Sequence, residues 1–142
     1  MSRVYQSSWW SVELPSGWLG RDDDECVLFV NVDGVGALQI SAFGSGDKEV
    51  TDEDLEDLSR DDDTENLNTE RVSYGQFVGL GICERIVTGY WRKYWLRARS
   101  VLLFVTYNCK LEDEGIEKHD VDRILHSLAL SESVSQREGL MN

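Results

Sequence analysis

The strongest constraint in this sequence is a run of four strand-like segments in its second half. They are residues 72–78, 82–88, 90–99 and 101–109, with glycines at 75, 79, 81 and 89 near the bends. A spacing of about ten residues per strand with short connections is typical of an antiparallel sheet. Residues 101–105 are apolar at every position, which predicts a central strand covered on both faces. We therefore expect an antiparallel meander.

The first half predicts three further strands, at residues 8–14, 26–32 and 36–43. In the first of them Trp10, Val12 and Leu14 alternate with more polar side chains, and Pro15 ends the strand. Trp18 and Leu19 are expected to tuck under the sheet. The pair Asp33-Gly34 between two apolar runs predicts an antiparallel hairpin with a type I′ turn, because both central residues of that turn need positive φ.

Two helices complete the pattern. Thr51 is the expected N-cap of a short acidic helix that ends near Ser59, and only two leucines give it an apolar edge. The second helix is indicated by apolar residues at i, i+3, i+4 and i+7, namely Val121, Ile124, Leu125 and Leu128. We predict one α+β domain over residues 1–142, a twisted antiparallel sheet of six to seven strands in the order βββα-ββββα with two flanking helices. An acidic insert is expected at 47–68 and a frayed tail at 132–142.

Three segments of this pattern resemble the Mog/PsbP-like group of proteins. They are Glu13-Leu14-Pro15-Ser16-Gly17-Trp18, the strand from Gly36 to Ala42, and the last helix placed after Tyr107-Asn108-Cys109. The similarity covers roughly residues 8–130 and implies a twisted antiparallel sheet flanked by helices. Members of the group mostly bind proteins, such as a small GTPase, photosystem subunits or hydrophobic segments of secreted effectors. The acidic insert of this chain has no counterpart in that pattern.

The negative charge of the chain is concentrated in one segment. The formal net charge is −13, and residues 21–70 carry 17 acidic and 3 basic side chains, which amounts to −14 for that segment. Such a field repels nucleic acid and anionic lipid, and it speeds association with basic partners. Two interpretations are equally open: a surface for a basic protein, with Asp61, Asp62 and Asp63 as its candidate residues, or a solvated loop that keeps the protein in solution.

The segment 90–99 is the other candidate binding surface. Strand alternation places Tyr90, Tyr94, Leu96 and Ala98 on one face, and Trp91, Lys93, Trp95, Arg97 and Arg99 on the other. Tryptophan and arginine are enriched in binding hot spots because each buries a large area and keeps a polar group. Three hypotheses remain open for this aromatic and basic face. It docks a protein, it stacks single-stranded nucleic acid, or it lies beneath the acidic loop and a helix with its basic groups paired internally.

The patterns that would indicate catalysis or a cofactor do not converge. His119 and His126 are expected on the solvent side of the last helix, and the glycines lack the spacing of a nucleophile elbow or a phosphate loop. The acids at 61–65 are suitable calcium ligands, but the EF-hand pattern is absent. Cys26, Cys83 and Cys109 lie in apolar runs and are expected as buried, reduced thiols. We predict no catalytic residue, no metal site and no cofactor.

The sequence therefore favours a protein-binding module over an enzyme. Its opening residues do not have the pattern of a signal peptide, and its apolar runs are too short to span a bilayer, so we expect a cytoplasmic protein with no membrane and no nucleic-acid partner. The preferred hypothesis is an immunity protein that neutralises a basic toxin. The alternatives are a chaperone or adaptor for a secreted effector or a GTPase partner, and, in a different class, an enzyme with a dispersed active site.

Overall fold

The structure is a computed structural model, and it describes residues 3–23, 26–44, 46–61 and 69–131. Its strands are β1 (Arg3–Gln6), β2 (Trp10–Leu14), β3 (Trp18–Asp22), β4 (Val27–Asn31), β5 (Gly36–Gly44), β6 (Glu70–Tyr74), β7 (Phe77–Ile86), β8 (Gly89–Ala98), β9 (Val101–Cys109) and β10 (Ala129–Leu130). The helices are α1 (Asp52–Asp61), the 3-10 helix η1 (Leu111–Asp113) and α2 (Lys118–His126).

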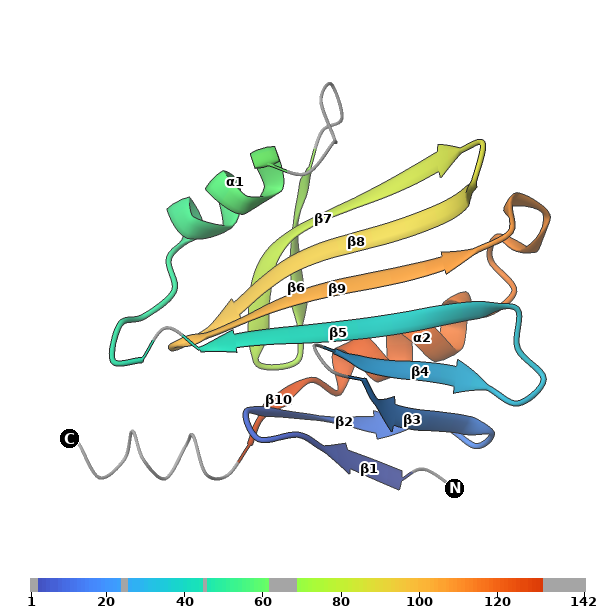
Figure 1. The fold of residues 1–142 in the computed structure, drawn as a ribbon, viewed down its shortest axis with the longest axis horizontal. Helices are drawn as coiled ribbons and strands as arrows, with labels where there is room; N and C mark the ends of the chain where they lie inside the picture. Colours follow the sequence, from blue (N-terminus) through green and yellow to red (C-terminus); the bar gives the residue numbers. More distant parts are fainter. Residues whose placement is uncertain (1–2, 24–25, 45, 62–68, 132–142) are drawn as a thin grey trace.

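A seven-stranded antiparallel sheet forms the centre of the protein (Figure 1), with the strand order β3-β4-β5-β9-β8-β7-β6. The long strand β9 lies in the middle, paired with β5 on one side and β8 on the other. This position explains its continuous apolar sequence, because both faces of β9 are covered by other side chains. The α+β class, the twisted sheet and the two flanking helices are confirmed.

The inner face of the sheet is covered by α2 and by a second, three-stranded sheet of order β1-β2-β10. Trp10, Val12 and Leu14 of β2 are buried there, as the alternation predicted. Val121, Ile124 and Leu125 of α2 are fully buried on the same side, and together these residues form the main hydrophobic core. The apolar stripe of α2 is therefore the feature that fixes this helix to the sheet.

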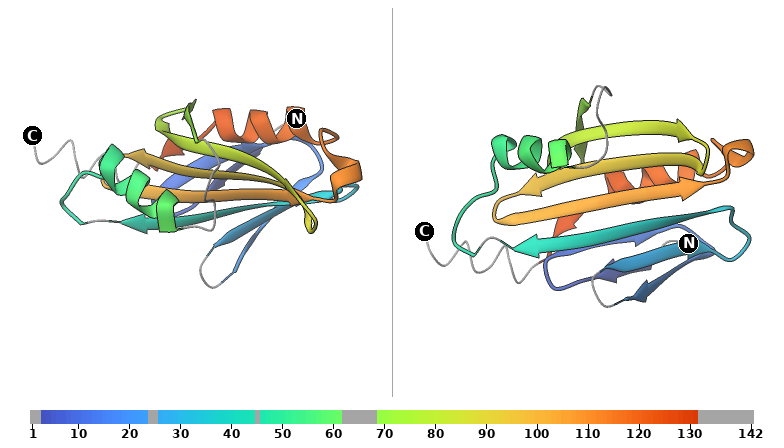
Figure 2. Two further views of the ribbon diagram at one scale, coloured as in Figure 1. Left: turned by 90° about the horizontal axis from the view of Figure 1, so that it is seen from above. Right: turned by 45° about the horizontal axis from the view of Figure 1, so that its top comes forward.

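The helix α1 lies on the opposite side of the sheet from α2, as the view from above makes clear (Figure 2). It begins with a reciprocal cap, in which the Asp54 backbone N–H donates to Thr51 Oγ1 at 3.1 Å and the Thr51 N–H donates to the Asp54 carboxylate at 2.9 Å. The predicted N-cap is confirmed. Leu55 of α1 is fully buried in a second, smaller core with Val50, Ile82, Trp95 and Leu102.

Several boundaries differ from the sequence prediction. Trp18 and Leu19 begin the edge strand β3; the Trp18 side chain is fully buried in the main core, as expected, whereas Leu19 is 49% exposed. The predicted first strand, now β2, belongs to the small sheet. The predicted strand at 72–78 is interrupted at Gly75. This residue lies in the turn between β6 and β7 and adopts a φ of 61° there. Gly79 and Gly81 then lie inside β7, where a Cβ on Gly81 would meet the Tyr94 ring at 2.5 Å. Close packing, rather than a bend, explains these two glycines.

The predicted hairpin between β4 and β5 is confirmed, but the prediction of a type I′ turn is wrong. Neither Asp33 nor Gly34 has a positive φ. The strands end at Asn31 and resume at Gly36, so the connection is longer than a two-residue turn. Gly34 is required for a different reason, because a Cβ there would lie 2.5 Å from Glu117 Oε2.

Candidate protein-binding site

The aromatic and basic face of β8 is the face on which α1 packs. The helix contacts β7 and β8, and the strand register places Trp95 opposite Phe104 and Leu80. Trp95 is only 3% exposed, and its ring lies 5.6 Å from that of Phe104. This end of the aromatic and basic face is part of the second core. Trp95 is therefore covered by the protein and not exposed to solvent.

Arg97 is tied to the same helix. Its Nε donates to an Asp52 carboxylate oxygen at 2.8 Å, and Arg71 on β6 approaches the other oxygen at 3.5 Å. The hydrogen bond from Arg97 holds the pKa of Asp52 below its ordinary value, and this effect outweighs the opposing effect of burial. Two arginines thus share the single negative charge of Asp52, the first residue of α1.

Trp91 and Lys93 lie further along the strand. Lys93 Nζ lies 3.6 Å from Glu84 Oε1 on β7 and 5.9 Å from the centre of the Trp91 ring. The Trp91 Nε1 atom is buried and has no hydrogen-bond partner in the described part of the chain. Trp91 and Lys93 are both partly exposed, so this end of the face is only partly covered.

Arg99, the last basic residue of the predicted face, lies just beyond the end of β8. Arg99 is exposed in the β8–β9 turn, where its φ is 53° and its carbonyl accepts a hydrogen bond from the Val50 N–H at 2.8 Å. Asp61 is the last residue of α1. Asp62 and Asp63 lie outside the described residues, as do the rest of the predicted loop through 68 and the predicted tail at 132–142.

The exposed side of α1 is acidic. The helix sequence is DEDLEDLSRD, and its three acidic residues in the first turn agree with the helix dipole. Asp57 is paired with Arg60 at 2.6 Å, as Asp52 is paired with Arg97. Glu53 and Glu56 are exposed, and no described residue forms an ion pair with either of them. Part of the acidity of α1 therefore remains uncompensated within the described chain.

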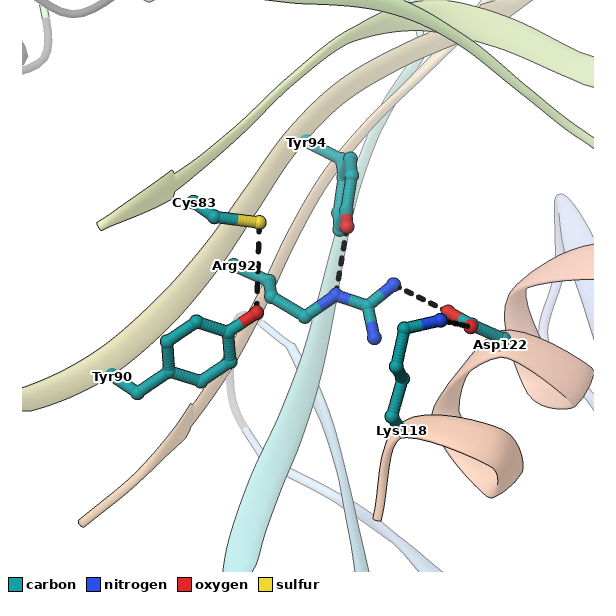
Figure 3. A network of polar contacts seen from close by, with 6 residues as sticks. All are labelled: Cys83, Tyr90, Arg92, Tyr94, Lys118 and Asp122. Atoms are coloured by element: carbon teal, nitrogen blue, oxygen red, sulfur yellow. Dashed lines mark hydrogen bonds and ion pairs between the residues drawn. The ribbon is translucent and has the colours of Figure 1, made fainter. Parts of the chain in front are cut away.

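The inner face of β8 carries a polar network that the sequence did not reveal (Figure 3). Arg92 is 6% exposed; its Nε donates to the Tyr94 hydroxyl at 2.8 Å, and its terminal nitrogen donates to Asp122 of α2 at 2.6 Å. Lys118 donates to the other oxygen of Asp122 at 2.8 Å. The only sequence signal for this network is that alternation places Arg92 between two tyrosines on the core face.

Burial dominates the ionisation of the tyrosines in this region. It raises the pKa of Tyr94, although the Arg92 charge acts in the opposite direction. The pKa of Tyr90 rises to about 12, chiefly by burial and further through its hydrogen bond to Cys83, whose Sγ lies 3.6 Å from the hydroxyl. The hydroxyls of Tyr90 and Tyr94 therefore stay protonated at physiological pH and can take part in the hydrogen bonds of the network.

A second polar contact joins the start of α2 to Tyr107 of β9, which lies directly opposite Arg92 in the β8–β9 register. Glu117, just before the helix, is buried and accepts hydrogen bonds on Oε1 from the Tyr107 hydroxyl at 2.8 Å and the Gly36 N–H at 2.9 Å. Burial, followed by the bond to Glu117, raises the pKa of Tyr107. This carboxylate is held by a β4–β5 hairpin more than 80 residues earlier in the chain, which no local pattern indicates.

The cysteines and histidines differ in part from expectation. Cys109 is buried, Cys26 is half-buried and Cys83 is exposed, so the prediction of a buried thiol is wrong for Cys83. None of the three cysteines forms a disulfide. His119 and His126 are both exposed, as predicted, but the His126 ring packs against Tyr74 at 5.1 Å. Among the described residues no group of three His, Cys, Asp or Glu side chains is arranged to hold a metal ion.

The sheet order and its two flanking helices define a PsbP-like α+β fold, which confirms the fold-level resemblance. The solution structure of cyanobacterial PsbP (CyanoP) from Synechocystis matches with a TM-score of 0.64 and 16% sequence identity, over 92% of each chain. A crystal structure from Bacteroides thetaiotaomicron matches with a TM-score of 0.65 and 16% identity over 89% of this chain. This chain spans about half of that protein, 46% of its length. At such identity the likeness concerns the fold alone.

Comparisons with protein-family models and with curated proteins found no match to this sequence. Within the described residues, no helix combines the length and the apolar content that crossing a bilayer requires.

Proposed function

We propose that the protein is a non-catalytic module that binds a basic protein, in the manner of an immunity protein that neutralises a cationic toxin. The observation that carries this proposal is the uncompensated acidic surface of α1, with Glu53 and Glu56 at its exposed side. An acidic surface steers a basic partner toward itself and favours it over acidic competitors. The helix is also fixed to the sheet by Leu55 and by the Asp52–Arg97 pair, so its charges are presented in a defined geometry.

A second candidate function is an adaptor that uses apolar contacts, for a secreted effector or a GTPase partner. It is favoured by exposed apolar side chains on two segments, the β7–β8 hairpin and the region around η1. Both segments lie at the end of the sheet away from α1 (Figure 1). The exposed side chains are Ile86 and Val87 in the β7–β8 hairpin and Leu111 and Ile116 near η1. The two segments are joined by a bidentate pair between Arg85 and Glu114, at 2.6 and 2.5 Å. The rival enzyme class has less support, because His126 contacts an aromatic ring rather than a carboxylate.

The two protein-binding hypotheses differ in how association depends on salt. The full-length protein is immobilised, and the basic proteins of its source organism, isolated on a cation exchanger, are passed over it. The association rate of each captured protein is then measured at rising NaCl concentration. An acidic docking surface predicts a steep fall in the association rate with salt, whereas apolar docking predicts a shallow one.

A pair of double variants locates the charge that matters. Glu53→Gln/Glu56→Gln removes two charges from α1, and Glu13→Gln/Glu112→Gln removes two from exposed positions on β2 and η1. We expect the first variant to slow association several-fold and the second to have little effect, because screening limits electrostatic influence to about 10 Å. Equal slowing by both variants, or an association rate independent of salt, would contradict the proposal.

A further inference from the structure

An open groove runs beside α1, between the helix and the strands β5 and β9. Its volume is about 480 Å³, and its floor is formed by Phe43, Val50, Leu58 and Leu102. Phe43 and Leu102 are directly opposite each other in the β5–β9 register, so they share the outer face of the sheet. Leu58 reaches the groove from the helix. Eight of its nine lining residues lie between 43 and 58, so the groove is built mainly by the connection from β5 to α1, with Leu102 contributed by β9.

Two of the floor residues are unusually exposed for their size. Phe43 is 57% exposed and Leu58 is 41% exposed, whereas Val50 and Leu102 are buried. Large apolar side chains that face solvent together in a concave site lose contact with water when a partner covers them, and this loss favours binding. The volume also falls within the range of sites that accept side chains or small ligands.

The rim of the same groove is acidic. Glu49, Asp54 and Asp57 line it, and Lys48 is its one basic lining residue. The carboxylate of Asp54 caps the helix and that of Asp57 accepts from Arg60, so both are held in place at the edge of the apolar floor. Glu53 and Glu56 extend the negative charge along the exposed side of α1. An apolar floor beneath an acidic rim is complementary to an apolar side chain flanked by positive charge.

We infer that this groove binds a cationic amphipathic segment of the partner protein, with an apolar side chain seated between Phe43 and Leu58 and lysines or arginines along the acidic rim. The inference rests on the proposed function and specifies how the basic partner is recognised. Charge at α1 supplies the orientation and the rate of encounter, and the groove supplies the contact that discriminates between basic proteins.

The test uses the full-length protein and synthetic peptides as probes. The first peptide is a twelve-residue lysine-rich helix former with two leucines four positions apart. The second replaces both leucines by serine, and the third replaces the lysines by glutamate. Binding is measured by fluorescence anisotropy of the labelled peptides, and the site is located by NMR shift changes. We expect binding of the first peptide, with shifts at Phe43 and Leu58. We expect an affinity about tenfold lower for the serine peptide, because it lacks the leucine that would be seated between these two residues, and loss of a seated anchor costs about that factor.

Matched variants separate the groove from general acidity. Phe43→Ser and Leu58→Ser each remove an exposed floor residue without opening the core, and Val87→Ser removes an exposed apolar residue at the far hairpin. We expect about five- to tenfold weaker binding of the leucine peptide for the first two variants and no change for the third. Thermal melts of all three variants check that the fold is intact.

The outcomes distinguish this inference from the proposed function. If the leucine and serine peptides bind equally and Leu58→Ser changes nothing, the groove is not the site, although recognition of basic partners stands. If the glutamate peptide binds as well as the lysine peptide, the electrostatic basis of the proposed function fails while an apolar groove remains. A dimer that dissociates in Leu58→Ser would show that a second copy of the chain occupies the groove, which would overturn the inference.

Discussion

The guanidinium of Arg97 on β8 donates a hydrogen bond to Asp52 at the start of α1, over a distance of 2.8 Å. This pair joins the two parts of the sequence that each carry a strong charge signal, the basic strand and the acidic helix. It shows that one end of the basic strand face is paired within the protein. The charge available to a partner is therefore the acidic surface left on α1, not the arginine beneath it.

The Asp52–Arg97 pair predicts a pH-dependent attachment of α1. Because the pKa of Asp52 is lowered in the folded protein, its ionised form contributes stability above the unfolded pKa of about 4, and this contribution is lost as the pH falls through the lowered value. We expect NMR hydrogen-exchange protection of the α1 amides to decrease in that range. Asp52→Asn should show lower protection at neutral pH and little further pH dependence.

Glu53→Gln is the matched control for that experiment, since Glu53 lies beside Asp52 and forms no ion pair with a described residue. Its protection should follow the pH profile of the unmodified protein. A similar loss of pH dependence in both variants would mean that the helix dipole, rather than Arg97, accounts for the effect.

The two cations that share Asp122 should differ in importance. Arg92→Met removes a buried guanidinium and leaves the Tyr94 hydroxyl without that bond, so we expect a loss of about 2–4 kcal/mol in the free energy of unfolding. Lys118→Gln removes an exposed partner of the same carboxylate and should cost about 0–0.5 kcal/mol. Urea unfolding measures both. An Arg92→Met variant as stable as the parent would show that desolvation of the arginine cancels its bonds.

Gly34 should be intolerant of a side chain although its φ is not positive. An alanine Cβ would lie 2.5 Å from Glu117 Oε2 and 2.9 Å from Asn31 Cβ. We expect Gly34→Ala to cost about 1–3 kcal/mol in unfolding free energy, as overpacking does elsewhere. In a Glu117→Ala background part of that cost should disappear, which a double-mutant cycle detects. Purely additive losses would mean that the clash is with Asn31 alone.

The three thiols should react at different rates in the folded protein. Cys83 is exposed, whereas Cys109 is buried and its pKa is raised by that burial. Since the thiolate is the reactive form, Ellman's reagent should modify Cys83 first and Cys109 only on unfolding. Cys83→Ser should remove the fast phase. If a fast phase remains after this substitution, it is due to Cys26 and the prediction for Cys83 is wrong.

Local patterns in the sequence determined the elements and the apolar face of each. The alternation of Trp10, Val12 and Leu14, the stripe of α2 and the cap at Thr51 all act over a few neighbouring residues, and they were predicted correctly. The strand at 72–78 was misplaced because glycine can mark a turn, as at Gly75, or a close contact, as at Gly79 and Gly81. These two roles look alike until the neighbouring strand is known.

Only the tertiary structure decided which polar side chains are internal. Arg92 meets Asp122 thirty residues later, Glu117 meets Gly36 eighty-one residues earlier, and Trp95 is covered by a helix forty residues before it. Arginine and tryptophan suit both a core and an interface, since each combines a large apolar area with a polar group. Their residue type therefore sets what they can do, and the long-range packing of helices on the sheet sets which of those roles they have.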